Sequence, residues 1–319
     1  MTAVGLRSMP PLLDTHFPAT LGDVRTLSEL FTWRVAQTPH ANAYLQYDEA
    51  TQSWSPITWE TVATRVEQLA QSLARLPLPR GARIAILLPN GLDAVCFDQA
   101  ALALACVAVP MHALDNPASI AYILADSDTS VLVAQTQEQW QAIVDTGVAL
   151  PSLRQVLIVE KTAAAPPSDG TRSVLLMADW LAQAEPSPVA TTHIGPAPDE
   201  LATLVYTSGT TGKPKGVMLT HDNVLENVKA TLQRVAPKPD DVFLSFLPLS
   251  HTFERTAGYY LPIAAGCAVA HARSVALLSE DMKTVRPTIL ISVPRIYERV
   301  YSVLQGMLAD SAPKARLFA

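Results

Sequence analysis

The amino-acid sequence predicts an α/β fold with largely parallel sheets, and two observations lead to that class. Short apolar runs rich in β-branched residues alternate with longer stretches of helical pattern along the chain. The apolar runs lack polar alternation, as expected for strands whose sheet is covered by helices on both faces. With 319 residues, 49% of them hydrophobic, the chain can build an extensive core.

Strands and helices are expected to follow one another, with prolines and glycines near their ends. The expected strands are continuous apolar runs, at residues 84–88, 107–109, 130–134, 155–159, 202–206, 242–246, 268–270 and 288–292. The expected helices are longer and carry periodic apolar positions, at residues 59–76, 91–106, 117–125, 138–144, 222–235, 252–264, 279–285 and 295–308. This order predicts repeated strand–helix–strand units.

Two stretches of different composition divide the chain. Residues 161–170 read KTAAAPPSDG, and residues 184–198 contain four prolines. Both are predicted to be surface loops or linkers, on either side of a short element at 174–182. We therefore expect a first α/β subdomain over residues 1–190 and a second over residues 191–319.

Charge and cysteine content exclude several classes of protein. The chain has 23 basic and 29 acidic side chains, a net charge of −6, and no basic run, which disfavours a duplex nucleic-acid binder. The most apolar stretch, 94–111, contains Asp98 and Gln99, whereas a bilayer span needs about 20 mostly apolar residues. The three cysteines form no CxxC pair, which indicates reduced thiols and a cytoplasmic protein.

The segment after the expected strand at 202–206 carries the most specific chemistry. From Thr207 to Gly216 it reads TSGTTGKPKG. Glycines let backbone N–H groups turn inward, hydroxyls add neutral donors and lysines add positive charge, so the segment is predicted to bind a polyphosphate. It is not a Walker A loop, because Pro214 follows the Gly-Lys pair, and no GxGxxG motif is present.

Around this loop, the sequence YTSGTTGKPKGVMLTH resembles the signature of the adenylate-forming, or AMP-binding, enzyme superfamily. The preceding segments ITWETVATRVEQLAQSL and IAILLPNGLDAVCFDQAALALACVAVP are similar to the same superfamily. FLPLSHTFER at 246–255 and ISVPRIYERVY at 291–301 resemble its long-chain fatty acyl-CoA synthetase branch. The resemblance implies two adjoining doubly wound, largely parallel sheets with helices on both faces, as part of an acyl-CoA synthetase-like N-terminal domain.

The resemblance also implies a reaction. Enzymes of this kind join a carboxylate to ATP, which gives an acyl-adenylate and pyrophosphate, and then transfer the acyl group to CoA. The parent enzyme is therefore expected to be a long-chain fatty acid–CoA ligase, an acid–thiol ligase that uses ATP, Mg²⁺ and coenzyme A. Its partners would be these small molecules and not nucleic acid, and a fatty substrate is compatible with peripheral membrane contact.

The same resemblance assigns roles to residues. The loop residues expected to bind the β- and γ-phosphates are Thr207, Ser208, Gly209, Thr210, Thr211, Gly212, Lys213 and Lys215. Mg²⁺ is expected near Thr207. His251 is the candidate catalytic residue, because it follows the expected strand at 242–246, and ligands of open α/β sheets gather at the carboxyl ends of strands. Glu254 and Arg255 could form either an internal ion pair or a solvated helix edge.

Relatives continue beyond the similar region with segments that this sequence does not contain. These are an aromatic-Gly-x-Thr-Glu loop, a ribose-binding aspartate and a mobile C-terminal domain with an adenylating lysine. The chain is therefore expected to be an N-terminal fragment of a longer enzyme and to be inactive in adenylation on its own. Two alternatives stay open: a fatty acyl-AMP ligase that loads a carrier protein, and a non-catalytic nucleotide-binding module.

Overall fold

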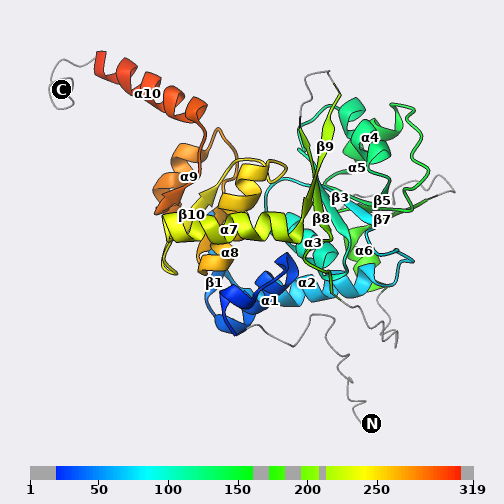
Figure 1. The fold of residues 1–319 in the computed structure, drawn as a ribbon. Coiled ribbons are helices and arrows are strands. Elements are labelled where there is room, and N and C mark those ends of the chain that lie inside the picture. Colours follow the sequence, from blue (N-terminus) through cyan, green and yellow to red (C-terminus); the bar gives the residue numbers. More distant parts are fainter. Residues whose placement is uncertain (1–18, 161–171, 184–194, 208–212, 310–319) are drawn as a thin grey trace, which may run out of the picture.

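The computed structural model describes residues 19–160, 172–183, 195–207 and 213–309, and it contains two β-sheets that lie side by side with helices packed around them (Figure 1). Most strands in both sheets pair in parallel. The predicted α/β fold with two adjoining, largely parallel sheets is therefore confirmed. No helix within the described ranges is both long and apolar enough to span a bilayer.

The larger sheet has seven strands in the order β7-β6-β5-β3-β4-β8-β9. Their bounds are β3 Arg83–Leu87, β4 Val107–Pro110, β5 Thr129–Ala134, β6 Gln155–Ile158, β7 Ser173–Leu176, β8 Leu201–Thr207 and β9 Lys215–Thr220. Neighbouring strands are parallel except for the last pair, because β8 and β9 form an antiparallel hairpin. The sequence did not predict β9 as a strand, since its side chains are mostly exposed at the sheet edge.

Helices cover both faces of this sheet. On one face lie α4 (Pro117–Asp126) and α5 (Gln137–Val144), whose buried side chains pack on apolar residues of β5 and β6. On the other face lie α2 (Trp59–Leu73), α3 (Leu92–Ala103) and the short α6 (Met177–Ala182). Coverage on both sides explains why the central strands are apolar throughout.

The smaller sheet has five strands in the order β12-β10-β11-β1-β2. Their bounds are β1 Asn42–Asp48, β2 Ser53–Thr58, β10 Val242–Ser245, β11 Ala268–His271 and β12 Ile289–Leu290. The β1–β2 hairpin is antiparallel and was not predicted, whereas β1 pairs with β11 in parallel. Sheet membership does not follow chain order on either side of residue 190, because β1 and β2 join the later strands and β8 and β9 join the earlier ones.

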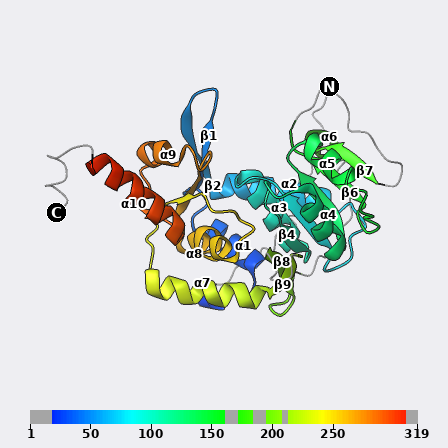
Figure 2. The same ribbon diagram turned by 90° about the horizontal axis from the view of Figure 1, so that it is seen from above.

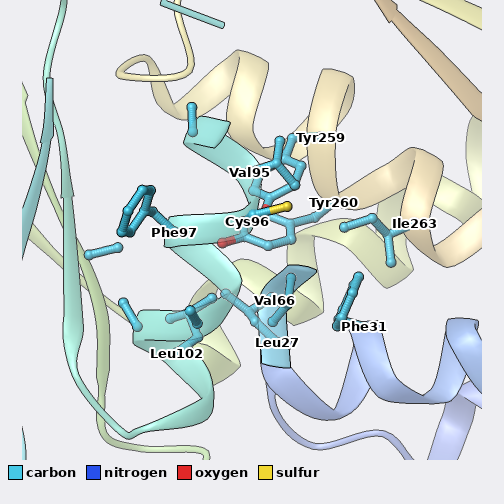
Figure 3. Close-up of a cluster of buried hydrophobic side chains, with 14 of the residues drawn as sticks. Leu27, Phe31, Val66, Val95, Cys96, Phe97, Leu102, Tyr259, Tyr260 and Ile263 are labelled. Atoms are coloured by element: carbon cyan, nitrogen blue, oxygen red, sulfur yellow. The ribbon is translucent and has the colours of Figure 1, made fainter. Parts of the chain in front are cut away.

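A shared core joins the two sheets. In it α1 (Leu27–Gln37), the π-helix η2 (Glu254–Tyr260) and α8 (Leu261–Ala265) pack against α2 and α3. Figure 3 shows Phe31, Val66, Cys96 and Ile263 meeting in this core. The long α7 (His221–Val235) contacts β9 as well as η2 and α8, so it braces both sheets.

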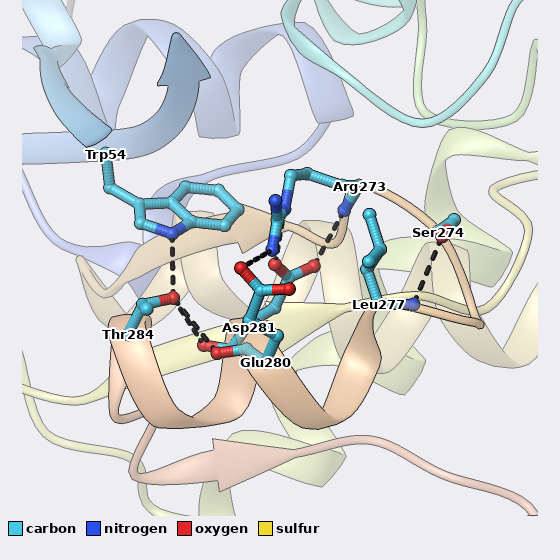
Figure 4. A network of polar contacts seen from close by, with 7 residues as sticks. All are labelled: Trp54, Arg273, Ser274, Leu277, Glu280, Asp281 and Thr284. Carbon is cyan, nitrogen blue, oxygen red and sulfur yellow. Dashed lines mark hydrogen bonds and ion pairs between the residues drawn. The ribbon is translucent and has the colours of Figure 1, made fainter. Parts of the chain in front are cut away.

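The far end of the five-stranded sheet carries α9 (Leu278–Val285), with α10 (Pro294–Ala309) beyond it, as Figures 1 and 2 show. A polar network ties α9 to the β1–β2 hairpin (Figure 4). Arg273 donates from Nε to Asp281 Oδ1 at 2.6 Å, and its guanidinium lies 4.3 Å from the Tyr47 ring centroid. On the same side, Trp54 Nε1 donates to Thr284 Oγ1 at 3.1 Å.

Candidate functional site

The predicted phosphate loop connects β8 to β9. Thr207, the last residue of β8, pairs with Lys215, the first residue of β9, so the two ends of the loop are held side by side. The other proposed loop residues Ser208, Gly209, Thr210, Thr211 and Gly212 lie outside the described residues. The hairpin therefore fixes where the loop starts and ends at the carboxyl edge of the seven-stranded sheet.

A tyrosine braces the base of this hairpin. A Cβ on Gly216 would lie 3.0 Å from Cζ of Tyr206, so this glycine leaves the space that the tyrosine ring occupies. The Tyr206 hydroxyl donates to Asp126 Oδ2 at 2.7 Å. Burial and this carboxylate raise the pKa of Tyr206 above its usual range, which keeps the phenol protonated as a donor. The hairpin is thereby anchored to α4.

The two lysines of the loop are both exposed, and Lys213 Nζ lies 5.7 Å from the ring centroid of Tyr122 on α4. Two cationic side chains on one hairpin can attract an anion such as pyrophosphate. Thr207 is exposed beside them. Among the described residues, no group of three or more His, Cys, Asp or Glu side chains could hold a metal ion.

A cavity of about 520 Å³ lies where the carboxyl edges of the two sheets face each other. From the seven-stranded sheet it is lined by residues that directly follow β3 and β4, including Asn90 and Met111. From the five-stranded sheet it is lined by residues that follow β10 and β11, including Phe246, Leu249 and Val275. Ligands of open α/β folds bind at such carboxyl edges, and the phosphate loop follows β8 at the same edge.

Buried charges form part of the cavity wall. Arg255 Nη2 donates to Asp98 Oδ1 at 2.7 Å, and both side chains are at most 4% exposed. The hydroxyls of Tyr259 and Tyr260 donate to Asp98 Oδ2 at 3.1 and 3.0 Å, and Gln99 Nε2 donates to the Tyr259 oxygen at 2.6 Å. Glu254 and Arg255 are therefore both buried, so they are not a solvated helix edge, but the internal ion pair that Arg255 forms is with Asp98 and not with Glu254.

This network joins α3 of one sheet to η2 of the other. Burial by itself would lower the pKa of Arg255, but the Asp98 carboxylate outweighs it and raises that pKa, so the guanidinium stays charged. Burial, together with Asp98, raises the pKa of Tyr259 well above its usual value. The tyrosines therefore remain neutral donors, and the buried aspartate accepts three hydrogen bonds, one from Arg255 and one from each tyrosine.

Glu254 is a second buried charge-bearing group, at the start of the π-helix. Its Oε1 accepts a hydrogen bond from Ser245 Oγ at 2.6 Å, and Oε2 has no hydrogen-bond partner among the described residues. Burial raises the pKa of Glu254 to about 7. A Cβ at Gly258 would overlap the Glu254 carboxyl group, so the glycine makes room for it. Single π-turns of this kind are frequent at functional sites.

The candidate catalytic residue His251 lies at the start of the helical turn that precedes η2. Its backbone N–H donates to the Pro248 carbonyl at 2.9 Å, and its side chain is exposed. Ser250, its neighbour, lines the cavity, whereas His251 itself is not one of the lining residues. The cavity-lining residues missed by the sequence analysis include Asn90, and His112, whose Nδ1 lies 3.6 Å from Asp115 Oδ1. Both come directly after strands, which is the signal that could have found them.

Comparison with known proteins gives the family. Residues 31–318 match the AMP-binding enzyme family. Long chain acyl-CoA synthetase 6, peroxisomal, of Arabidopsis thaliana is 31% identical over 268 residues, which are 82% of this chain and 38% of that protein. Long-chain-fatty-acid–CoA ligase FadD15 of Mycobacterium bovis is 28% identical over 279 residues, 83% of this chain and 43% of that protein. The chain spans about two fifths of the length of these relatives.

Solved structures show the same fold. The N-terminal domain of FACL13 from Mycobacterium tuberculosis matches with a TM-score of 0.66 at 22% identity, over 86% of this chain and 64% of that one. The A domain of carboxylic acid reductase from Segniliparus rugosus, solved with AMP and a co-purified carboxylic acid, matches with a TM-score of 0.73 at 22% identity, over 89% of this chain and 51% of that one. Since the family match covers nearly all of the sequence, this chain belongs to the AMP-binding enzyme family.

Proposed function

We propose that this chain forms the phosphate-binding and acyl-binding part of an ATP-dependent long-chain fatty acid–CoA ligase. The observation that carries the proposal is the apolar cavity at the sheet edge from which the lysine-bearing hairpin projects. The names of the long-chain relatives support the same substrate class. Free cysteine thiols throughout the described residues fit a reducing compartment such as the cytoplasm, where a fatty substrate could also be drawn from a membrane surface.

The proposed reaction has two steps. A carboxylate oxygen of the fatty acid attacks the α-phosphorus of ATP, and the bond from that phosphorus to pyrophosphate breaks. The CoA sulfur then attacks the acyl carbon of the adenylate, loses its proton, and AMP leaves. In the first step most of the catalysis is positioning and stabilisation of charge on the leaving group.

Lys213, Lys215 and the proposed loop residues Ser208–Gly212 would stabilise the departing pyrophosphate. Charge-assisted hydrogen bonds to phosphate are roughly twice as strong as neutral ones, so the lysines are expected to contribute most. Thr207 would offer one hydroxyl oxygen to the Mg²⁺ that accompanies ATP, a cation that neutralises phosphate charge. The hairpin pairing of Thr207 with Lys215 would keep the loop aimed at the leaving group.

The cavity would hold the fatty chain, with its carboxylate toward His251 and the hairpin. Apolar side chains that follow strands of both sheets line it, among them Met111 after β4, and Phe246 and Leu249 after β10. Each buried methylene contributes about 0.8 kcal/mol, so a long chain would bind far better than acetate. His251 would border the carboxylate and the phosphates as the candidate catalytic residue.

The test uses the protein at its full encoded length and measures acyl-CoA formation from a long-chain fatty acid and from acetate. We expect a strong preference for the long chain. Lys215→Ala should lower kcat/KM for ATP on the order of 10²-fold, about 2.7 kcal/mol, through the loss of a charge at the pyrophosphate. Lys283→Ala, which removes an exposed lysine from α9, is the matched control and should leave kcat/KM unchanged.

Three results would overturn parts of the proposal. A preference for acetate would reject the long-chain substrate class. Formation of the acyl-adenylate without a CoA thioester would reject CoA as acceptor. Equal kinetics for Lys215→Ala and Lys283→Ala would reject the phosphate role of Lys215.

A further inference from the structure

Asn90 lies between the two sheets, in a place that neither the family match nor the phosphate loop explains. It follows β3 by three residues, precedes α3, and lines the cavity with a half-buried side chain. Its backbone lies in the loop that connects β3 of the seven-stranded sheet to α3. Its side-chain partners are at the end of β10 of the five-stranded sheet and in the loop that follows it, more than 150 residues further along the chain.

The Asn90 amide makes two hydrogen bonds to one loop. Its Nδ2 donates to the Leu247 carbonyl at 2.6 Å, and its Oδ1 accepts from the Leu249 N–H at 3.0 Å. A weaker contact of 3.4 Å joins Nδ2 to Ser245 Oγ, which in turn donates to Glu254. Because one partner is an acceptor and the other a donor, only an amide in this orientation satisfies both.

The clamped loop is the segment 246–250, which connects β10 to the turn that begins with His251. All five of its residues line the cavity. The loop has no strand or helix of its own. The Asn90 amide therefore gives two of its backbone groups partners that would otherwise have to come from water or from a shifted loop. The His251 N–H is bonded back to Pro248 of the same loop, so the loop position also sets the position of His251.

We propose that Asn90 is a positioning residue, whose side-chain amide holds the loop 246–250 against the seven-stranded sheet and so fixes the cavity wall and His251. The hydrogen bonds alone support the clamp. The role of the clamped loop and of His251 in catalysis rests on the proposed function. It assigns Asn90 no contact with the reacting atoms. It extends the site to a residue in the loop that follows β3 of the other sheet.

The test compares two asparagines that cap or clamp backbone groups. Asn90→Ala removes both hydrogen bonds, whereas Asn90→Asp keeps the acceptor for Leu249 and places a second acceptor against the Leu247 carbonyl. Asn116 is the control, because its side chain caps α4 by accepting from the Ser119 N–H. Asn116→Asp keeps that cap, and Asn116→Ala loses it, which costs stability of a similar size without touching the loop.

The first readout is independent of activity. Hydrogen exchange of the Leu249 amide in the 319-residue chain should quicken roughly 10-fold in Asn90→Ala and stay at the native rate in both Asn116 variants. The second readout is kinetics of the protein at its full encoded length. There Asn90→Ala and Asn90→Asp should each lower kcat with the fatty acid roughly 10-fold and leave KM for ATP unchanged, while Asn116→Asp keeps the native values.

The outcomes distinguish the clamp, the positioning role of Asn90 and the proposed function from one another. An unchanged Leu249 exchange rate in Asn90→Ala would overturn the clamp, whatever the enzyme does. Quickened exchange with native kcat in both Asn90 variants would overturn the positioning role. Quickened exchange in a protein whose native form makes no acyl-adenylate would overturn the proposed function and with it the site that Asn90 is said to position. Loss of kcat in Asn90→Asp but not in Asn116→Asp supports the inference, even if Asn90→Ala fails to fold.

Discussion

The two faces of the seven-stranded sheet are stabilised in different ways. Under α4 and α5 the buried side chains are apolar, with Leu132, Trp140 and Ile158 among them. On the opposite side, where α3 meets η2, apolar packing surrounds the buried Asp98–Arg255 pair. Apolar burial is non-directional, whereas a buried ion pair is satisfied in one geometry only. We therefore expect the first face to supply stability and the second to fix one arrangement of the sheets around the cavity.

The largest expected effect comes from breaking the ion pair on one side. Asp98→Ala would leave Arg255 buried without its counter-charge and should lower the free energy of unfolding by about 4 kcal/mol. Replacing both partners, as Asp98→Leu with Arg255→Met, should restore stability to within about 1 kcal/mol of the native chain. Urea unfolding measures both. If the double variant is as unstable as the single one, the pair supplies net stability, and the contrast between the two faces fails.

On the apolar face, truncating a buried side chain should lower the free energy of unfolding only by leaving a cavity. Leu132→Ala, in the centre of β5, should lower the free energy of unfolding by about 3 kcal/mol, because a fully buried side chain is truncated where the structure cannot collapse. The loss should be the same at pH 5 and pH 7. Leu114→Ala, at a side chain 87% exposed, is the control and should change stability by less than about 0.5 kcal/mol.

A smaller effect should appear as a pH dependence of the free energy of unfolding, caused by Glu254 at the junction between the two sheets. The folded-state pKa of Glu254, about 7, exceeds the ordinary value of 4.5, so the folded state binds more protons in this window. Its contribution is therefore present below pH 4.5 and is lost as pH rises through 7, a fall of about 3 kcal/mol. His221 and His271, whose pKa burial lowers to about 4, act in the opposite sense between pH 4 and 6.5.

The comparison with Glu254→Gln isolates the glutamate from these histidines. The glutamine keeps an oxygen that can accept from Ser245 but carries no titratable group. The difference in unfolding free energy between the two proteins should change across pH 4.5–7, while the histidine contribution cancels. A constant difference over that range would show that Glu254 does not titrate near neutrality in the folded chain.

Much of the larger sheet could be predicted because its central strands are buried on both faces, and this burial appears in the local sequence as an apolar run. β3, β5 and β6 are uninterrupted apolar runs and were predicted to within about two residues, an accuracy typical of element ends. The β1–β2 hairpin lacks that signal, since its exposed positions are polar and its parallel partner β11 lies more than 200 residues further on. Pairing over such a distance leaves no local pattern.

The site was predictable only where chemistry is concentrated in one segment. The loop from Thr207 to Lys215 combines glycines, hydroxyls and lysines in a single run. Asn90 and Asp98 are single polar residues in apolar surroundings, and their roles come from contacts with Leu247 and Arg255 across the cavity. The π-turn was likewise hidden inside an expected helix, because it depends on the Glu254 carboxyl group filling the space beside Gly258.

The three cysteines can report the order in which parts of this molecule unfold. Cys96, Cys106 and Cys267 are free and buried, and burial raises the pKa of each thiol, to about 11 at Cys106 and about 12 at Cys267. Only a thiolate attacks an alkylating reagent, so each thiol reacts when its surroundings come apart. Cys96 lies in α3 at the junction, and Cys267 directly precedes β11. Mass analysis of alkylated peptides over time would therefore reveal the order in which the surroundings of Cys96 and of Cys267 open, with no substitution introduced into the chain.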